Sequence, residues 1–292
     1  MKTLVYGEVL FDVYPDKACI GGAAFNFASH LVLEGADVSL LTAVGRDDLG
    51  RRAKEYMVSY GIDVSRVLEN GFDTGRVTVT LDSKGVPSYL VHTNTSYDNI
   101  VFDDGFDFDS LKEYDVLYFG TLIQRSDASR KSLRRLVSEC KFSQIFCDVN
   151  LRKNCYDRDS VRFCLENATI LKISDEEEPI LRELGMYNCA VVNERNISES
   201  ICNAYPNVKL VIITLGSKGS YVYESVNVTD YYQGVIDCDV VSTVGAGDSF
   251  GAAFMAAFCN GMPINECLRR GAVLSSYVVA HAEAVPEGRP EY

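Results

Sequence analysis

The stretch Val241-Ser-Thr-Val-Gly-Ala-Gly-Asp-Ser-Phe250 runs directly into Gly251–Cys259, an apolar segment with the composition of a buried helix. Its two glycines let backbone N–H groups converge without obstruction by side chains. The first turn of the helix directs its unpaired N–H groups and positive dipole end at the same point. The expected anion hole consists of Gly245, Ala246 and Gly247. Asp248 follows at once, so a carboxylate able to take a proton from an attacking hydroxyl is expected beside an anion, which suits phosphoryl transfer.

Two common nucleotide-binding patterns do not fit this stretch. A Walker A loop requires G-x-x-x-x-G-K-[ST], and the sequence contains no such string. Gly245-x-Gly247-x-x-x-Gly251 is one residue too long for the dinucleotide pattern, and a further helical segment follows where a strand is needed. A dinucleotide oxidoreductase is therefore disfavoured, while a tight N-cap turn without chemistry remains an alternative for this stretch taken alone.

Short β-branched and aromatic runs alternate with segments of helical period along the chain. This pattern predicts an α/β fold with a central, mostly parallel sheet covered by helices on both faces. The expected strands are Thr3–Tyr6, Val38–Ala43, Val116–Phe119, Gln144–Val149, Ile170–Ile173 and Leu210–Thr214. The expected helices include Ala24–Glu34, Ala128–Cys140 and Glu176–Leu184. Ligands of such sheets bind at the carboxyl ends of the strands, so the site is expected there.

Residues 11–20 and 74–100 break this rhythm and alternate with the period of strands, the second segment turning at Ser83-Lys-Gly85. We interpret them as a small β-sheet lid, with an edge hairpin that has no role in closure as the alternative. The main domain would then comprise residues 1–10, 21–73 and 101–292. An apolar lid face would favour a homodimer through the lids, and its expected members are Val77, Val79, Leu81 and Leu90.

The composition bears on partners and location. The 292 residues are 47% hydrophobic, and the formal charge of −13 disfavours nucleic acid and anionic lipid surfaces as partners. No apolar run is long enough to span a bilayer and none directs export, so a cytoplasmic protein is expected. The ten cysteines include no C-x-x-C pair and the three histidines are isolated, which favours buried reduced thiols over disulfides or a metal cluster.

Motifs distributed along the whole chain point to one family. Gly21-Gly-Ala-Ala-Phe-Asn26 has the form G-G-x-x-x-N, and Thr243-Val-Gly-Ala-Gly-Asp248 has the form T-x-G-A-G-D. Between them, in order, come Asp148-Val-Asn-Leu-Arg152, Lys172-Ile-Ser-Asp-Glu-Glu177 and Thr214-Leu-Gly-Ser-Lys-Gly219. Together these segments resemble the ribokinase-like (pfkB) carbohydrate kinases over essentially the whole chain. Within that family, Gly7–Asp16 and Ser96–Asp98 are most similar to bacterial fructokinases.

The resemblance implies an ATP-dependent kinase that phosphorylates a primary hydroxyl of a small sugar, fructose first, with ATP and Mg²⁺ as cofactors and Asp248 as the base. The implied sugar-binding residues are Asp12, Gly21, Gly22, Asn26, Gln124, Asn150 and Arg152. The implied nucleotide-binding residues are Lys172, Thr214, Gly216, Gly219, Gly247 and His281. Glu177 is implied to organise water around Mg²⁺. Four of these residues also have an alternative interpretation without a functional role. Arg152 could form an exposed ion pair, and Glu177 could belong to an acidic first turn of a helix. Gly216–Gly219 could form a hairpin turn, and His281 could serve packing alone.

Three positions depart from the family pattern. Ser242 stands where relatives carry an aspartate that helps to hold a monovalent cation, so potassium activation is left open. Ser174 replaces an asparagine in the motif of Glu177, and Glu283 stands where a glycine is frequent. The nearest alternative function is a kinase for ribose, a nucleoside or 2-keto-3-deoxygluconate. An alternative of another class is a catalytically idle protein that binds a sugar or nucleotide.

Overall fold

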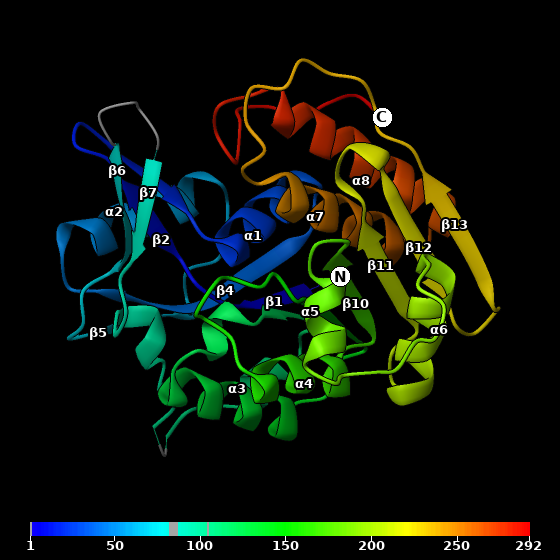
Figure 1. Ribbon diagram of the computed structural model, residues 1–292. Helices are drawn as coiled ribbons and strands as arrows, with labels where there is room; N and C mark the ends of the chain where they lie inside the picture. Colours follow the sequence, from blue (N-terminus) through cyan, green and yellow to red (C-terminus); the bar gives the residue numbers. More distant parts are fainter. Residues whose placement is uncertain (1, 82–86, 104) are drawn as a thin grey trace.

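The computed structural model describes residues 2–81, 87–103 and 105–292, and a large sheet forms its centre (Figure 1). In this part of the chain the sheet has nine strands in the order β13-β12-β11-β10-β9-β8-β1-β4-β5. The strands run parallel except at one edge, where β12 pairs antiparallel with both β11 and β13. Their bounds are β1 Lys2–Tyr6, β4 Asp37–Gly45, β5 Val67–Asn70, β8 Val116–Gly120, β9 Gln144–Asp148, β10 Ile170–Ser174, β11 Leu210–Thr214, β12 Ser220–Glu224 and β13 Thr229–Gln233. The predicted mostly parallel sheet is therefore confirmed.

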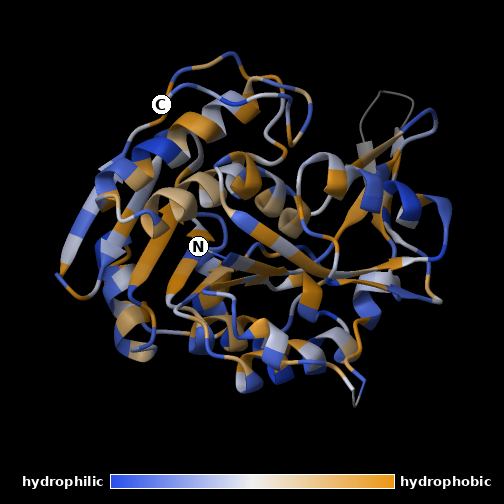
Figure 2. Cartoon of the chain, turned by 180° about the vertical axis from the view of Figure 1, so that it is seen from behind, coloured by the Kyte–Doolittle hydropathy of each residue, from blue (hydrophilic) through white to orange (hydrophobic). Residues whose placement is uncertain are grey.

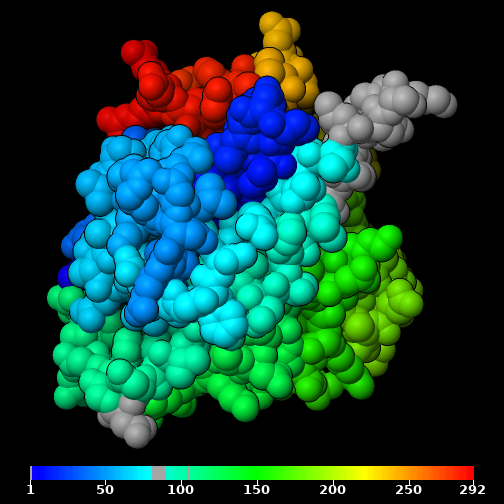
Figure 3. Space-filling view, turned by 90° about the vertical axis from the view of Figure 1, so that its left-hand side faces the viewer, coloured from blue at the N-terminus to red at the C-terminus, as the bar shows by residue number. Residues whose placement is uncertain are grey.

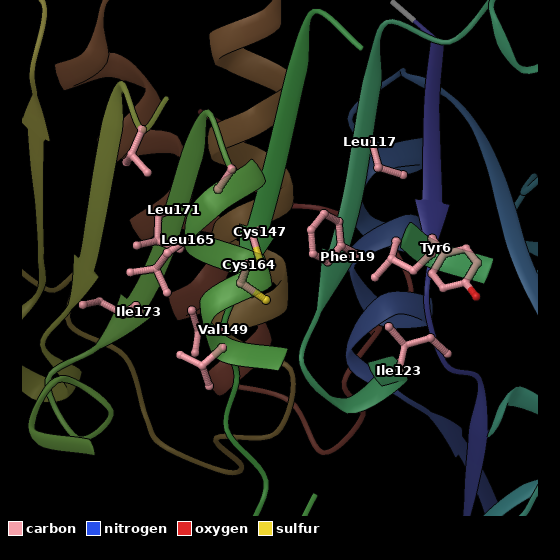
Figure 4. Close-up of a cluster of buried hydrophobic side chains, with 14 of the residues drawn as sticks. Tyr6, Leu117, Phe119, Ile123, Cys147, Val149, Cys164, Leu165, Leu171 and Ile173 are labelled. Atoms are coloured by element: carbon pink, nitrogen blue, oxygen red, sulfur yellow. The ribbon is translucent and has the colours of Figure 1, made fainter. Parts of the chain in front are cut away.

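Helices cover both faces of this sheet, because successive strand side chains point to opposite faces. In β1, Val5 packs into one buried cluster while Leu4 and Tyr6 pack into the other. One layer contains α1 Ala23–Leu33, α2 Asp48–Ser59, α7 Ala246–Cys259 and α8 Ile264–Val279. The opposite layer contains α3 Asp127–Glu139, α4 Arg158–Asn167, α5 Glu178–Glu183 and α6 Glu194–Ala204. Figure 2 shows the apolar strands between these layers, and Figure 4 shows part of the cluster beneath α3 and α4.

The helices begin in two different ways. The N-cap residues of α2, α4 and α6 are Asp47, Asp157 and Asn193, and each side chain accepts a hydrogen bond from a backbone N–H of the first turn. Helix α7 starts behind Gly245, which has no side chain to offer and adopts a left-handed φ of 81°. The first turn of α7 is therefore left open toward the carboxyl ends of the parallel strands.

A second, four-stranded sheet lies beside the first in the described residues, in the order β3-β2-β6-β7. Its bounds are β2 Leu10–Val13, β3 Ala18–Gly21, β6 Gly75–Leu81 and β7 Pro87–Val91. Its blue and cyan segments are neighbours on the surface in Figure 3. The expected turn at Ser83–Gly85 lies outside the described residues. The strand pattern expected to continue to residue 100 ends at Val91. Thr95 and Asp98 then form a capping box that starts a 3₁₀ turn.

The apolar face expected for lid-to-lid contact is only partly free. Val77 and Val79 are 7% and 1% exposed within one chain, whereas Leu90 is 62% exposed. The side chain of Leu81 is not among those described. The surface that these residues can offer to a second copy is therefore smaller than the sequence predicts.

The cysteines are free thiols, as expected, but they are not uniformly buried. Cys19 and Cys238 are exposed, because they lie on β3 of the small sheet and in the loop after β13. Five others are buried: Cys140, Cys147, Cys155, Cys164 and Cys267. In residues 2–81, 87–103 and 105–292 we find no cluster of three metal-ligating side chains. The helices of the same ranges include none with the length and apolar character needed to cross a membrane.

Candidate active site

Asp248 lies in the first turn of α7, buried behind the carboxyl ends of the parallel strands, with 8% of its surface exposed. Its Oδ2 accepts a hydrogen bond of 2.8 Å from Asn26 Nδ2 on α1. Burial, together with repulsion from Asp148, raises the pKa of Asp248 to about 6, although Asn26, Lys172 and Arg152 act in the opposite direction. A carboxylate with such a pKa is mostly charged at neutral pH and is able to accept a proton.

The backbone around Asp248 leaves unpaired only part of the anion hole expected from Gly245, Ala246 and Gly247. The N–H of Ala246 bonds to the Thr243 carbonyl at 3.3 Å, and the N–H of Ser249 bonds to the Gly245 carbonyl at 2.9 Å. The N–H groups of Gly247 and Asp248 have no hydrogen-bond partner in the described part of the chain. Two unpaired donors therefore lie at the positive end of a 14-residue helix, where an anion is favoured.

A buried ion pair lies against this turn. Lys172 Nζ is 2.7 Å from Asp148 Oδ2, and the two side chains are 7% and 3% exposed. A Cβ added at Gly247 would be 3.3 Å from the same Nζ, so the ammonium group adjoins the anion hole. Burial alone would lower the pKa of Lys172, but Asp148, Glu177 and Asp248 raise it above its ordinary value. Lys172 therefore stays positively charged beside the expected phosphate position.

Asp148 has a second feature of interest: its Oδ1 is buried and has no hydrogen-bond partner. Buried carboxylate oxygens without a partner are rare and costly. Mg²⁺ prefers oxygen ligands and commonly takes one or two carboxylates together with water and phosphate. The free oxygen of Asp148 therefore fits a magnesium ion that accompanies a nucleotide.

The residues predicted to bind sugar approach Asp248 from the small sheet and from the start of α1. In the antiparallel pair of β2 and β3, Asp12 lies opposite Cys19, and a Cβ added at Gly21 would be 3.8 Å from Asp12 Oδ2. Gly22 precedes α1 with a φ of 109°, and a Cβ there would be 2.8 Å from the Glu8 carbonyl. A side chain at Gly22 would thus collide with the backbone of Glu8, whereas one at Gly21 would contact Asp12.

Arg152 and Asn150 follow β9 and flank the same region. Arg152 is exposed and forms no ion pair with the described residues, which argues against a simple surface salt bridge. Its charge counteracts the burial that raises the pKa of Asp12, and it also lowers the pKa of Asp248, so it lies near both carboxylates. Asn150 adopts a left-handed φ of 42° that turns the chain from β9 toward Arg152.

Glu177 binds two loops together. Its Oε1 accepts the N–H of Leu151 at 2.5 Å, and its Oε2 accepts the N–H of Ser174 at 2.8 Å. Burial and the nearby Asp148 raise its pKa. Glu177 thus joins the loops that follow β9 and β10. The sequence points to Glu177 as the acidic residue near the metal, whereas the carboxylate oxygen without a hydrogen-bond partner belongs to Asp148.

The residues predicted to bind nucleotide lie on both sides of this centre. Thr214 ends β11, and Gly216–Lys218 form a 3₁₀ turn into β12, so the segment is also the hairpin turn that was the alternative. Gly219 has a φ of 110°, and a Cβ there would be 2.1 Å from the Gln233 carbonyl, which explains the glycine. His281 follows α8 and packs its ring on Tyr277 at a centroid distance of 4.4 Å.

The structure does not bring Gln124 into the site. Its side chain is fully buried and donates to the Gly120 carbonyl and to Cys164 Sγ, on the face covered by α4. Cys164 belongs to the apolar cluster in Figure 4. The amide nitrogen of Gln124 is therefore bound inside the core, while its Oε1 has no hydrogen-bond partner, and the expected sugar contact stays a prediction.

Glu8 is a residue of the site that the motif reading did not select. It follows β1 and is 5% exposed, and its Oε1 accepts the N–H of Ala23 at 2.9 Å. Burial raises the pKa of Glu8 to about 7, and the charge of Asp248 acts in the same direction. An acidic residue within the apolar run Leu4–Phe11, directly after a strand, was the signal that could have identified it.

Known carbohydrate kinases match nearly the whole chain. A model of the pfkB family carbohydrate kinases matches residues 15–289. An Arabidopsis thaliana protein named probable fructokinase-6 is 26% identical over 288 residues, covering 89% of this chain and 70% of that protein. An ATP-dependent 6-phosphofructokinase from Thermoanaerobacterium thermosaccharolyticum is 24% identical over 302 residues, covering 97% and 89%. The crystal structure of an uncharacterised sugar kinase from Pyrococcus horikoshii in complex with ATP has a TM-score of 0.82 at 23% identity, covering 97% and 93%.

Proposed function

Because this chain belongs to the pfkB family of carbohydrate kinases and has a ribokinase-like fold, we propose that it transfers the γ-phosphate of MgATP to a primary hydroxyl of a small sugar, with fructose as the first choice. One observation carries the proposal. The buried carboxylate of Asp248 lies at the open start of α7, between Asn26 on the sugar side and Lys172 on the phosphate side.

The chain's own residues account for the transfer step. Asp248 takes the proton of the sugar hydroxyl, whose oxygen forms a bond to the γ-phosphorus while the bond from that phosphorus to the ADP oxygen breaks. The N–H groups of Gly247 and Asp248 and the ammonium of Lys172 stabilise negative charge on the transferred group. Asp12 orients the sugar by accepting hydrogen bonds from its hydroxyls, and Asn26 does so through an amide that can both accept and donate.

A magnesium ion bound with the nucleotide would be held by Asp148, whose Oδ1 is buried and unpaired, with Glu177 close to it. Such an ion supplies positive charge that neutralises the phosphates. Lys172 remains paired with the other oxygen of Asp148 at 2.7 Å, so the carboxylate is already oriented before a nucleotide binds.

The small sheet serves as a lid in this account, with residues 11–20 and 74–100 as its segments. Asp12 lies on β2 of this sheet, so a sugar that binds Asp12 is covered from the same side. Exclusion of water protects the activated phosphorus from hydrolysis. Contact between the lids of two copies remains a proposal, for which the exposed Leu90 is the available apolar contribution.

Fructose is favoured by the resemblance of the N-terminal segment to fructokinases and by the similarity to a fructokinase relative. The similarity to a 6-phosphofructokinase makes fructose 6-phosphate a further acceptor to test. The test is ADP release, coupled to an indicator reaction, with MgATP and a panel of fructose, fructose 6-phosphate, ribose, a nucleoside and 2-keto-3-deoxygluconate. We expect sugar-dependent ADP release from the wild type with fructose as the best acceptor.

Two variants complete this experiment. Asp248→Asn should lower turnover by roughly 10²–10⁴ while the dissociation constant of MgADP stays unchanged. Asp109→Asn removes an exposed carboxylate on the opposite helical layer and serves as the matched control. Sugar binding without ADP release from the wild type would favour the idle binding protein, and full turnover by Asp248→Asn would refute the role of the base.

A further inference from the structure

The C-terminal loop after α8 supports the first glycine of the anion hole. A Cβ added at Gly245 would be 2.8 Å from the Ala284 carbonyl oxygen and 2.9 Å from its Cα. Gly245 is the residue that turns the chain into α7, with a φ of 81°. The position of Ala284 therefore limits the position of Gly245, and through it the direction of the N–H groups that follow.

Two side chains from the N-terminal part of the chain hold this loop in place. His30, in the last turn of α1, has its Nε2 at 2.8 Å from the Ala284 carbonyl oxygen. The Tyr60 hydroxyl, at the end of α2, donates to the Val285 carbonyl at 3.1 Å, and its ring packs edge-on against Phe25 at 5.9 Å. Both carbonyls are thus bound by rigidly packed donors from the helical layer of α7.

The protonation state of His30 follows from its surroundings. The side chain is 1% exposed, and burial lowers its pKa to about 4, so the imidazole is neutral around neutral pH. A carbonyl oxygen can only accept, which assigns the ring hydrogen to Nε2. Nδ1 then remains an acceptor, and it is buried without a partner. In the described residues, the single hydrogen bond of the His30 side chain is therefore the one to the Ala284 carbonyl.

The same region does not fit a resident monovalent cation. Ser242 brings no negative charge where the family pattern has an aspartate, and its Oγ accepts the N–H of Val244 at 3.2 Å. The N–H groups of Val241 and Ser242 both bond to the Val279 carbonyl. Glu283 is the carboxylate nearest in sequence to Ala284, but it is exposed to water. Monovalent cations are held by several converging oxygen atoms, backbone carbonyls included. Here the carbonyls of Val279, Ala284 and Val285 and the Oγ of Ser242 already accept hydrogen bonds.

We propose that hydrogen bonds from His30 and Tyr60 hold the C-terminal loop against Gly245, and so position the anion hole of this chain, in the place of a monovalent cation. His30 and Tyr60 are then positioning residues for phosphoryl transfer, and the enzyme works without potassium. The rate predictions rest on the proposed kinase function. The stability predictions do not, so the two can fail separately.

The first experiment varies the cation. Thermal unfolding of the wild-type protein and its turnover with MgATP and the accepted sugar are measured in KCl, NaCl or tetramethylammonium chloride at equal ionic strength. We expect unfolding temperatures that agree within about 1 °C, because a cation that does not bind the folded state cannot stabilise it. Turnover should agree within about twofold. An increase of both quantities in KCl alone would overturn the proposal.

The second experiment removes the donors. His30→Phe should lower kcat about tenfold, the effect of losing about 1.4 kcal/mol of transition-state stabilisation, with little change in the KM for sugar. His30→Gln, which restores an N–H donor, should recover most of the loss, and Tyr60→Phe should lower kcat severalfold. Tyr277→Phe is the matched control, because its hydroxyl donates at 2.7 Å to Glu287 further along the same segment.

The outcomes separate position from folding. Each variant is also tested for MgADP binding, which needs a folded protein but no transfer step. Equal loss in His30→Phe and His30→Gln, equal loss in Tyr277→Phe, or rescue of His30→Phe by KCl would each contradict the positioning role. If the wild type phosphorylates no sugar, the proposed function fails, while the unfolding temperatures in the three salts still decide whether the loop binds potassium.

Discussion

The hydrogen bond from Asn26 to Asp248 makes the pH dependence of the reaction predictable. The pKa of Asp248 is about 6 and its charged form is the base, so kcat/KM should fall below about pH 6. Asn26 Nδ2 donates to the carboxylate at 2.8 Å, so Asn26→Ala raises this pKa. A hydrogen bond to a charged group contributes roughly 1.5–3 kcal/mol, and about 1.4 kcal/mol corresponds to one pKa unit. Because Lys172 and Arg152 remain, we take the lower value, a rise of about one unit.

The assay is the pH profile of kcat/KM for the sugar between pH 5 and pH 9. At pH 6.5 the charged fraction of Asp248 should fall from roughly three-quarters to roughly one-quarter, a loss of about threefold that disappears at high pH. Any loss that persists at pH 9 measures the sugar contact of Asn26. Ser29→Ala is the control, because its buried hydroxyl bonds to the Phe25 carbonyl on the same helix. An acid limb that does not move in Asn26→Ala, or that moves equally in Ser29→Ala, would refute the reasoning.

Three further predictions concern stability and the anion hole. The pKa of Glu8 in the folded protein is about 7, against an ordinary value of 4.5, so its contribution to stability falls as the pH rises through that window. Glu8→Gln should therefore raise the free energy of unfolding by at most about 3 kcal/mol at pH 8 and hardly change it at pH 4. Equal denaturant midpoints of the two proteins at pH 8 would contradict this. Lys172→Met leaves Asp148 buried without its partner and should lower the free energy of unfolding in urea by about 3–5 kcal/mol. Adding Asp148→Asn to this variant should recover part of the loss. If it recovers nothing, the broken ion pair is not the cause of the loss. Gly245→Ala places a side chain on a backbone with a φ of 81°, and its Cβ would be 2.8 Å from the Ala284 carbonyl oxygen. Both the unfolding temperature and kcat should therefore fall. A variant with wild-type values of both would show that the loop can move away without loss.

Much of the fold could be predicted because it depends on local patterns. The β-branched runs that form β1, β4 and β8 to β11 are buried on both faces, so their composition alone marks them as strands. The deviations have physical causes in single residues. Helix α5 starts at Glu178 rather than Glu176, with Pro179 at its start where the missing N–H costs nothing. The expected strand over 92–100 gives way to a turn that Thr95 and Asp98 cap.

The candidate site was predictable where a motif is contiguous and unpredictable where distant elements meet. Asp248 and its glycines adjoin in sequence, so the anion hole could be inferred directly. The burial of Gln124 could not be foreseen, because its partner Cys164 lies 40 residues away on another helix. The role of His30 depends on its contact with the C-terminal loop, 254 residues away in sequence, which no local pattern reveals.

The most direct test of the central claim is phosphorus-31 NMR of the wild-type protein with MgATP and the accepted sugar. We expect the γ-phosphate signal to be replaced by a phosphomonoester signal that is split into a triplet by the two hydrogens of a CH₂ group, as transfer to a primary hydroxyl requires. Release of inorganic phosphate alone, or a doublet from a secondary carbon, would contradict the geometry assigned to Asp248 and the sugar side of the site.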